Sequence, residues 1–154
     1  MSHAPSTKLS PAPAPLYERD LYAWSQEQAA LLRAGRLGEI DAENIAEEIL
    51  DVGKTEYRVL ESALRVLLWH MLKWDHQPEK RSRSWESTIL EQRGRVARQL
   101  RENPSLKPRL LEAVQAGYED GRLRASGETE IDLDRFPEAC PYDWDTIMNQ
   151  EFRR

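Results

Sequence analysis

The chain has 154 residues, of which 40% are hydrophobic and 32% are charged, and its formal net charge is −5. This composition suffices for a folded domain with a buried core, and the net negative charge opposes general binding to polyanions. The single cysteine, Cys140, excludes an intrachain disulfide and a cysteine-based zinc site, as is typical of a reducing compartment. Because the sequence has neither a signal-peptide pattern nor an uninterrupted apolar stretch of membrane length, we expect a cytoplasmic protein without membrane contact.

The N-terminal residues differ in composition from the rest of the chain. Residues 1–15 are rich in proline and alanine and have no helical apolar period, which predicts a disordered tail. Residues 16–154 are predicted to form a single all-helical domain. Its first helix is expected over residues 16–36, where Gly35 and then Gly38 supply stop signals.

A long second helix is predicted over residues 41–74, with Asp41 as its N-cap and Gly53 as a kink or break. At 100° per residue, one face of this helix collects Ile45, Ile49, Val52, Glu56, Leu60, Ala63, Leu67, His70 and Trp74. Glu56 and His70 are its polar members, and leaving a buried polar group unpaired costs about 1 to 3 kcal/mol. The two lie roughly 21 Å apart along the helix axis, so their partners must come from other helices or from another chain.

Three further helices complete the predicted bundle. Pro78 is expected to begin a third helix that runs to residue 101, and a fourth helix is expected over residues 104–125. Gly117 and Gly121, one turn apart, each cost the fourth helix about 1 kcal/mol relative to alanine, a loss that close approach to another helix could offset. A short last helix is expected from residue 143. The predicted fold class is all-α, a bundle of four main helices plus a short C-terminal helix, built on the antiparallel pair 41–74 and 78–101.

Basic residues are concentrated in the third helix and the corner before it. Residues 73–101 carry 8 basic and 4 acidic side chains, whereas residues 16–72 carry 6 and 11, and residues 102–154 carry 7 and 12. One interpretation is a nucleic-acid surface formed by Arg81, Arg83, Arg93, Arg95 and Arg98. The interpretation that we favour is pairing of these arginines with acidic residues of neighbouring helices or of a second subunit, namely Glu43, Glu47, Glu48 and Glu61.

The corner between the second and third helices carries the candidate site. Its polar residues are Glu56, His70, Lys73, Arg81, Glu91 and Arg93, and its hydrophobic plug is Trp74 and Trp85. His70 could serve as a general base oriented by Glu91, or could join Glu56 and Glu91 around a metal ion. The sequence contains no Glu-x-x-His or His-Glu-x-x-His pattern and no phosphate-binding glycine loop. We therefore favour a structural His70, hydrogen-bonded across the hairpin to Gln92 or Thr88, and predict no cofactor and no metal.

Four motifs carry a resemblance to a known family: YERDLYAWSQEQAALLRAGR, DAENIAEEI, HMLKWDHQPEKRSRSWESTILEQR and FPEACP. From residue 17 to about residue 150 the chain resembles the bacterial domain-of-unknown-function family 29. The resemblance implies an all-α domain, often present in several copies per genome, with no established activity. The positions that the family emphasises match Trp24, Asn44, Ala46, Glu47, Glu48, Glu56, His70, Lys73, Trp74, Pro78, Arg81, Trp85, Glu91 and Arg93. The chain departs from the family at Asp75 and His76, where an aromatic or amide pair is expected, so a catalytic role for these two would not be a family property.

The sequence does not identify a biochemical activity. The leading hypothesis is a non-catalytic interaction or regulatory module that self-associates, with a homo-oligomer or another bacterial protein as its partner. It rests on the length of the second helix and on the complementary acidic and basic faces. Two alternatives stay open, a metal-binding or hydrolytic enzyme centred on His70 and a nucleic-acid-binding protein that uses the basic third helix.

Overall fold

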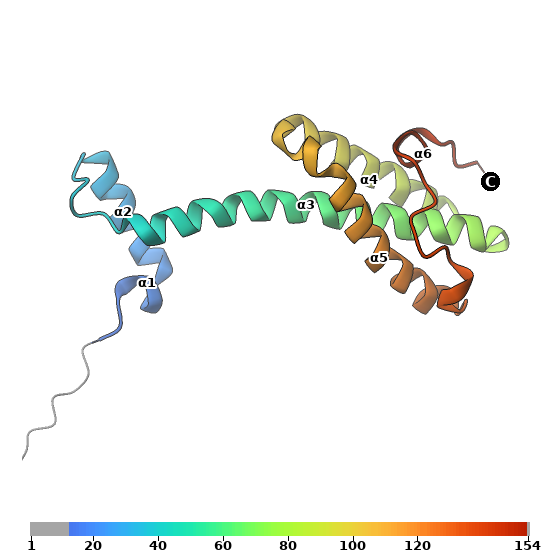
Figure 1. Cartoon of the computed structure of the whole chain (residues 1–154), viewed down its shortest axis with the longest axis horizontal. Helices are drawn as coiled ribbons and strands as arrows, with labels where there is room; N and C mark the ends of the chain where they lie inside the picture. Colours follow the sequence, from blue (N-terminus) through green and yellow to red (C-terminus); the bar gives the residue numbers. More distant parts are fainter. Residues whose placement is uncertain (1–12, 154) are drawn as a thin grey trace, which may run out of the picture. The chain divides into compact units, whose positions relative to one another are not determined.

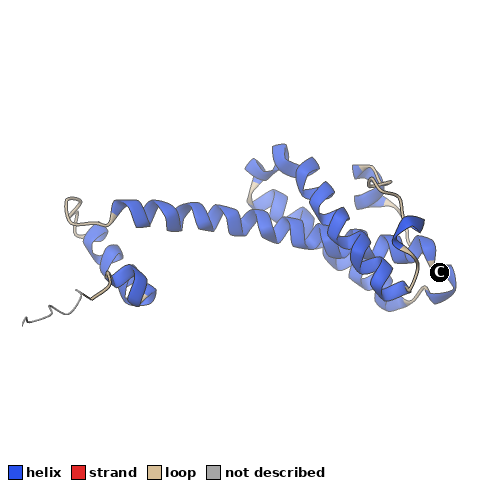
Figure 2. Ribbon diagram, turned by 60° about the horizontal axis from the view of Figure 1, so that its bottom comes forward, coloured by secondary structure: helices blue, strands red, loops and turns tan. Residues whose placement is uncertain are grey.

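The computed structural model describes residues 13–153. Over these residues the chain contains helices and loops but no strand (Figure 2), which confirms the all-α helical bundle predicted from the sequence. The predicted tail over residues 1–15 lies outside the described residues, apart from its last three. No helix within the described part is both long and apolar enough to cross a membrane.

The helices differ in length and type. In chain order they are α1 (Leu16–Arg19), α2 (Leu21–Arg33), α3 (Ala42–His76), the 3-10 helix η1 (Pro78–Lys80), α4 (Arg83–Glu102), the 3-10 helix η2 (Pro104–Arg109), α5 (Leu110–Thr129), the 3-10 helix η3 (Leu133–Arg135) and α6 (Trp144–Asn149) (Figure 1). The chain divides into two compact units, Met1–Asp51 and Val52–Arg154. The single domain expected from the sequence therefore stays a prediction.

In the first unit, α2 is joined to the start of α3 through polar side chains. The helix expected over residues 16–36 is interrupted at Asp20, whose carboxylate accepts a hydrogen bond from the backbone N–H of Ala23 and caps α2. Buried Trp24 donates its indole N–H to Asp41 at 3.2 Å, and the backbone N–H of Asp41 donates to buried Gln28 at 2.7 Å. Asp41 also accepts from the backbone N–H of Asn44 at 3.3 Å, as expected of an N-cap.

The 35-residue helix α3 continues through Gly53, so the break predicted there is wrong. A substituent at Gly53 would meet nothing within 4 Å, and one glycine lowers helix propensity by only about 1 kcal/mol. The apolar residues on the predicted face of this helix are buried from Leu60 onward, whereas those before Leu60 are not. Ile49 and Val52 are 66% and 64% exposed, whereas Leu60 and Leu67 are fully buried. The apolar period of the sequence correctly identifies which face of α3 is buried, but that face is buried only in the later part of the helix.

Proline determines where the next two helices begin. Pro78 starts the single 3-10 turn η1 rather than the third helix, and α4 begins after Ser82, whose hydroxyl accepts the backbone N–H of Trp85 at 3.3 Å. The expected fourth helix also begins later, because residues 104–109 form η2 around Pro108, which has no N–H to donate. The short last helix begins as expected, with Asp143 accepting the backbone N–H of Thr146.

Two glycines bring α5 against α3. A Cβ atom at Gly117 would lie 3.0 Å from the backbone nitrogen of Arg65, and one at Gly121 would lie 3.0 Å from the carbonyl oxygen of Arg65. Both distances are shorter than ordinary carbon contacts, so only glycine permits this separation of the two backbones. The close approach inferred from the glycine spacing is present.

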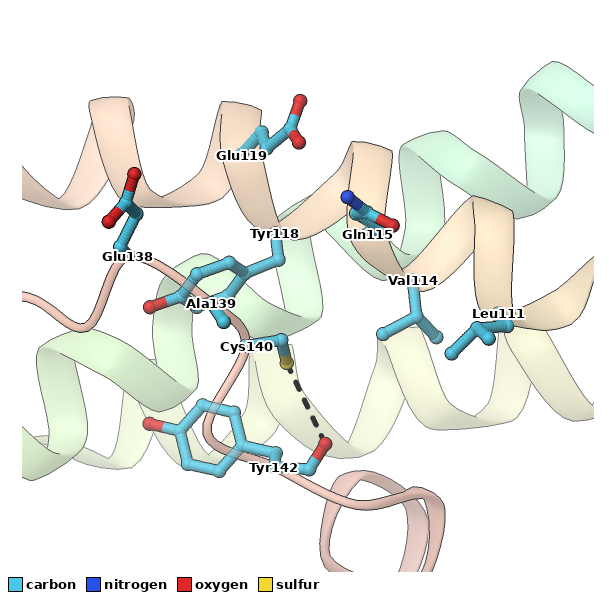
Figure 3. A pocket seen from close by; sticks show the side chains of 9 residues that line it. All are labelled: Leu111, Val114, Gln115, Tyr118, Glu119, Glu138, Ala139, Cys140 and Tyr142. Atoms are coloured by element: carbon cyan, nitrogen blue, oxygen red, sulfur yellow. Dashed lines mark hydrogen bonds between the residues drawn. The ribbon is translucent and has the colours of Figure 1, made fainter.

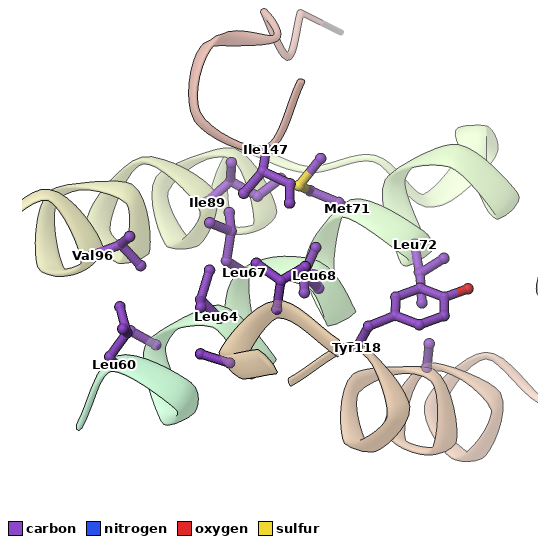
Figure 4. Close-up of a cluster of buried hydrophobic side chains, with 14 of the residues drawn as sticks. Leu60, Leu64, Leu67, Leu68, Met71, Leu72, Ile89, Val96, Tyr118 and Ile147 are labelled. Carbon is purple, nitrogen blue, oxygen red and sulfur yellow. The ribbon is translucent and has the colours of Figure 1, made fainter. Parts of the chain in front are cut away.

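The core of the second unit lies between the later half of α3 and the helices that follow it. Figure 4 shows Leu60, Leu64, Leu67, Leu68, Met71 and Leu72 of α3 together with Ile89 and Val96 of α4, Tyr118 of α5 and Ile147 of α6. These ten side chains are at most 1% exposed. Of the candidate polar residues, His70 and Lys73 are buried beside this core, whose close packing restricts their conformations.

Candidate functional site

His70 lies on the buried face of α3 and is 9% exposed. Its Nδ1 is 2.8 Å from the carbonyl oxygen of Val66, one turn earlier, so Nδ1 carries the hydrogen and donates it. Burial lowers the pKa of His70, and the nearby Lys73 charge adds to this effect, whereas the bond to Val66 opposes it. The imidazole is therefore held neutral within its own helix. Of the partners expected from the sequence, Thr88 instead donates to the carbonyl of Ser84.

Lys73 joins three helices at the corner. Its Nζ lies 2.6 Å from a carboxylate oxygen of Glu128 on α5, and 4.4 Å from the ring centroid of Trp85 on α4. The ring centroid of Trp69, on α3 itself, is 5.3 Å away. The Lys73 side chain is only 9% exposed, so its ammonium group is neutralised by one carboxylate and two aromatic faces. This cation therefore contacts a carboxylate of α5 and aromatic rings of α3 and α4.

Trp74 and Arg81 close the turn between α3 and α4. The guanidinium of Arg81 donates to the carbonyl oxygen of Trp74 at 2.9 Å and lies 5.1 Å from the centroid of its ring. The buried Trp74 ring packs edge-on against Phe152, with the ring centroids 5.4 Å apart. Of the two plug tryptophans, Trp74 therefore packs against the C-terminal segment, and Trp85 packs against Lys73.

Arg93 binds the end of α6. Its guanidinium donates to the carbonyl oxygens of Ile147 at 2.7 Å, Gln150 at 2.8 Å and Thr146 at 3.1 Å. The last carbonyls of a helix have no partner within the helix, so a cation at this position both satisfies them and complements the helix dipole. Burial lowers the pKa of Arg93 from its usual range. The donors of the Arg93 guanidinium are thus used by backbone carbonyls of the protein itself.

The two glutamates of the predicted site lie apart from His70. Glu56 accepts hydrogen bonds from the side-chain amides of Gln99 at 2.6 Å and Asn103 at 3.2 Å, which attaches α3 to the end of α4. Glu91 is exposed and pairs with Arg95 on the same helix at 2.7 Å. The structure therefore does not gather Glu56, Glu91 and His70 around one point. Over residues 13–153, no group of three or more His, Cys, Asp or Glu residues could hold a metal ion.

Comparison with known protein families gives one match. The model of the domain of unknown function DUF29 matches residues 16–153, nearly the whole chain. The chain belongs to the DUF29 family. No curated protein and no solved structure matched it.

A second set of polar groups in the DUF29 domain lies beside a cavity of about 560 Å³ between α5 and residues 138–142. Figure 3 shows the rings of Tyr118 and Tyr142 on either side of Cys140, whose thiol donates to the carbonyl oxygen of Tyr142 at 3.7 Å. The Tyr142 hydroxyl donates to Asp75 at 2.7 Å, and Tyr118 donates to the carbonyl of Pro137 at 2.6 Å.

Each of these cavity groups is held in its protonated form. Burial raises the pKa of Tyr118 to about 12 and raises the pKa of Cys140. Burial, together with the carboxylate of Asp75, raises the pKa of Tyr142 still further. A protonated thiol is a poor nucleophile, so this geometry serves packing and hydrogen bonding better than covalent chemistry.

Several partners of the site residues were missed from the sequence. Glu128 and Gln99 appear there as ordinary polar residues of amphipathic helices, and nothing in their spacing links them to Lys73 or Glu56. Arg93 binds backbone carbonyl oxygens, which every residue has, so the residue types in the sequence do not identify them as its partners. Asn103 lies between the predicted third and fourth helices, and the structure makes it the C-cap of α4 and a donor to Glu56. The DUF29 site residues thus act mainly as connections between helices.

Proposed function

We propose that the DUF29 domain is a non-catalytic interaction module that self-associates. The observation that carries this proposal is the exposure of two adjacent aliphatic side chains in the first part of α3: Ile49 is 66% exposed and Leu50 58%. A single exposed apolar residue is common, whereas neighbouring exposed aliphatic residues on one helix favour a protein-binding surface. Burying such a group contributes roughly 25 cal/mol per Å² of apolar area.

The geometry of the polar corner supports a non-catalytic role. His70 donates to its own helix, while Arg81 and Arg93 donate to backbone carbonyls. Lys73 is enclosed by Glu128, Trp69 and Trp85. Groups that bind and activate a substrate need donors directed into open space, whereas these donors are directed at the protein itself.

We further propose a cytoplasmic location and a protein partner, either a second copy or another bacterial protein. The single free thiol of Cys140 supports a reducing compartment. The negative net charge supports a protein partner over nucleic acid, and so does the engagement of Arg93 with α6.

Substitution of Ile49 by glutamate tests the proposal. We expect Ile49→Glu to shift the chain toward monomer because it places a charge in the proposed interface, and to change the free energy of unfolding of the monomer by less than about 0.5 kcal/mol. Light scattering after size-exclusion chromatography gives the mass. Leu123→Glu is the control, because Leu123 on α5 is similarly exposed, at 59%, and should leave the mass unchanged. Equal masses for wild type and Ile49→Glu would contradict the proposed surface.

A further inference from the structure

We propose that the acidic start of α3, residues 42–51, docks in a groove between α3 and α4 of a second copy of the chain. The inference rests on the self-association proposed above and assigns its two contact surfaces. Each surface lies within one compact unit of the chain, so each can be described by itself.

The groove has an apolar floor and a basic wall. Its volume is about 300 Å³, and it is lined by Val59, Ser62, Ala63 and Val66 of α3 and by Gln92, Arg95, Arg98 and Gln99 of α4. Val59 is 46% exposed, although it lies beside the buried Ala63. Gln99 is fixed by its bonds to the side chain and the carbonyl of Glu56, so this part of the groove is already ordered. A preformed groove lowers the entropy lost on docking.

The proposed occupant has the complementary chemistry. Residues 42–51, AENIAEEILD, include four carboxylates and no basic residue. The exposed Ile49 and Leu50 supply aliphatic side chains for the apolar floor. On an α-helix, Glu43, Glu47 and Leu50 fall within roughly a 60° arc, so two carboxylates border the aliphatic group along one edge.

The charges match in spacing as well as in sign. Glu43 and Glu47 are exposed and one turn apart on α3, and Arg95 and Arg98 are exposed and one turn apart on α4. Arg95 now pairs with Glu91 of its own helix, an exposed contact that is readily exchanged for another. Helix-in-groove recognition uses this combination of aliphatic anchors with flanking charges.

Both complementary surfaces are present in one chain, which is why we assign the occupant to a second copy. The acidic stretch belongs to one compact unit of the chain and the groove to the other. Each copy therefore offers one acidic stretch and one groove. Two copies can exchange these contacts reciprocally, as in a closed two-fold dimer.

Reciprocal charge reversal tests this assignment. One full-length variant carries Glu43→Lys and Glu47→Lys, and the other carries Arg95→Glu and Arg98→Glu. In either variant alone, like charges would meet at both contacts, so we expect at least a tenfold weaker self-association in sedimentation experiments. In an equal mixture, lysines meet glutamates at one contact and wild-type pairs form at the other. The mixture should therefore form mixed dimers with near wild-type affinity.

The outcomes separate the two proposals. Self-association of wild type that persists in both variants would overturn the groove assignment and leave the proposed function intact, whereas a wild type that is monomeric throughout would overturn both. Two monomeric variants whose mixture stays monomeric would also overturn the groove, because the missing rescue shows a non-specific charge effect. Far-UV circular dichroism checks folding, and the single changes Glu47→Lys and Arg98→Glu provide a milder matched pair. Mixed dimers formed only on mixing would support the assignment.

Discussion

Lys73 shows how much of the candidate site depends on one side chain. Its ammonium group bonds Glu128 of α5 and lies over the rings of Trp69 of α3 and Trp85 of α4. A mostly buried cation is tolerated only with such compensation, because removal from water opposes the charged form. The same side chain could bind an external anion only by giving up Glu128.

Loss of the carboxylate partner should therefore destabilise the fold. We expect Glu128→Gln to lower the free energy of unfolding by about 1 to 3 kcal/mol, because it leaves the ammonium group of Lys73 without an opposite charge. The partial exposure of Glu128, 45% of its side chain, favours the lower end of this range. Denaturation in urea measures the difference. Glu91→Gln is the control, since the exposed Glu91–Arg95 pair should contribute at most about 0.5 kcal/mol. Equal losses in the two variants would contradict this account of Lys73.

His70 should make stability depend on pH. Burial lowers its pKa below the ordinary value of 6.5, so the unfolded chain binds the extra proton first as pH falls. The stability that neutral His70 contributes is complete above pH 6.5 and is lost as pH falls through the lower pKa of the folded state. We expect the free energy of unfolding to fall more between about pH 7.5 and about pH 5.5 in wild type than in His70→Gln. Identical falls in the two proteins would show that His70 is not the responsible group.

At the scale of elements, the close contact of α5 with α3 depends on glycine. We expect Gly121→Ala to destabilise the fold by about 1 to 3 kcal/mol, because its new Cβ would meet backbone atoms that cannot move aside. The nearest are the carbonyl oxygen of Arg65 at 3.0 Å and the nitrogen of Trp69 at 3.1 Å. Gly94→Ala on α4 meets nothing within 4 Å and should instead stabilise by up to about 1 kcal/mol through helix propensity. Opposite signs in thermal or urea unfolding would confirm the contact, and a stabilising Gly121→Ala would exclude it.

Several features of the elements could be predicted because their causes are local. The period of α3, the N-cap Asp41, the start of the last helix at residue 143 and the glycine pair of α5 all depend on residues a few positions apart. Pro78 and Pro104 each begin a 3-10 helix instead of the α-helix that the sequence predicts, since proline suits the first turn of both. The covered length of α3 could not be predicted, because Ile49 and Leu67 have the same helical pattern and differ only in what packs against them.

The partners within the site depend on contacts between distant parts of the chain. Lys73 and Glu128 are 55 residues apart, and Arg93 and Gln150 are 57 apart. The residue types in the polar corner were identified from the sequence together with the family resemblance. The packing of α4, α5 and α6 on α3 determines which of these residues contact one another. That packing cannot be derived directly from a single sequence.

For the whole molecule, we propose that the DUF29 domain functions as a self-associated protein. Sedimentation equilibrium of the unaltered, untagged chain, from nanomolar to high micromolar concentration, tests it most directly. We predict a reversible rise from the mass of one chain, 17.9 kDa, to twice that mass. The rise should need higher protein concentration in high salt, because salt screens the proposed contacts between glutamate and arginine. A mass of one chain at every concentration and salt level would contradict the claim.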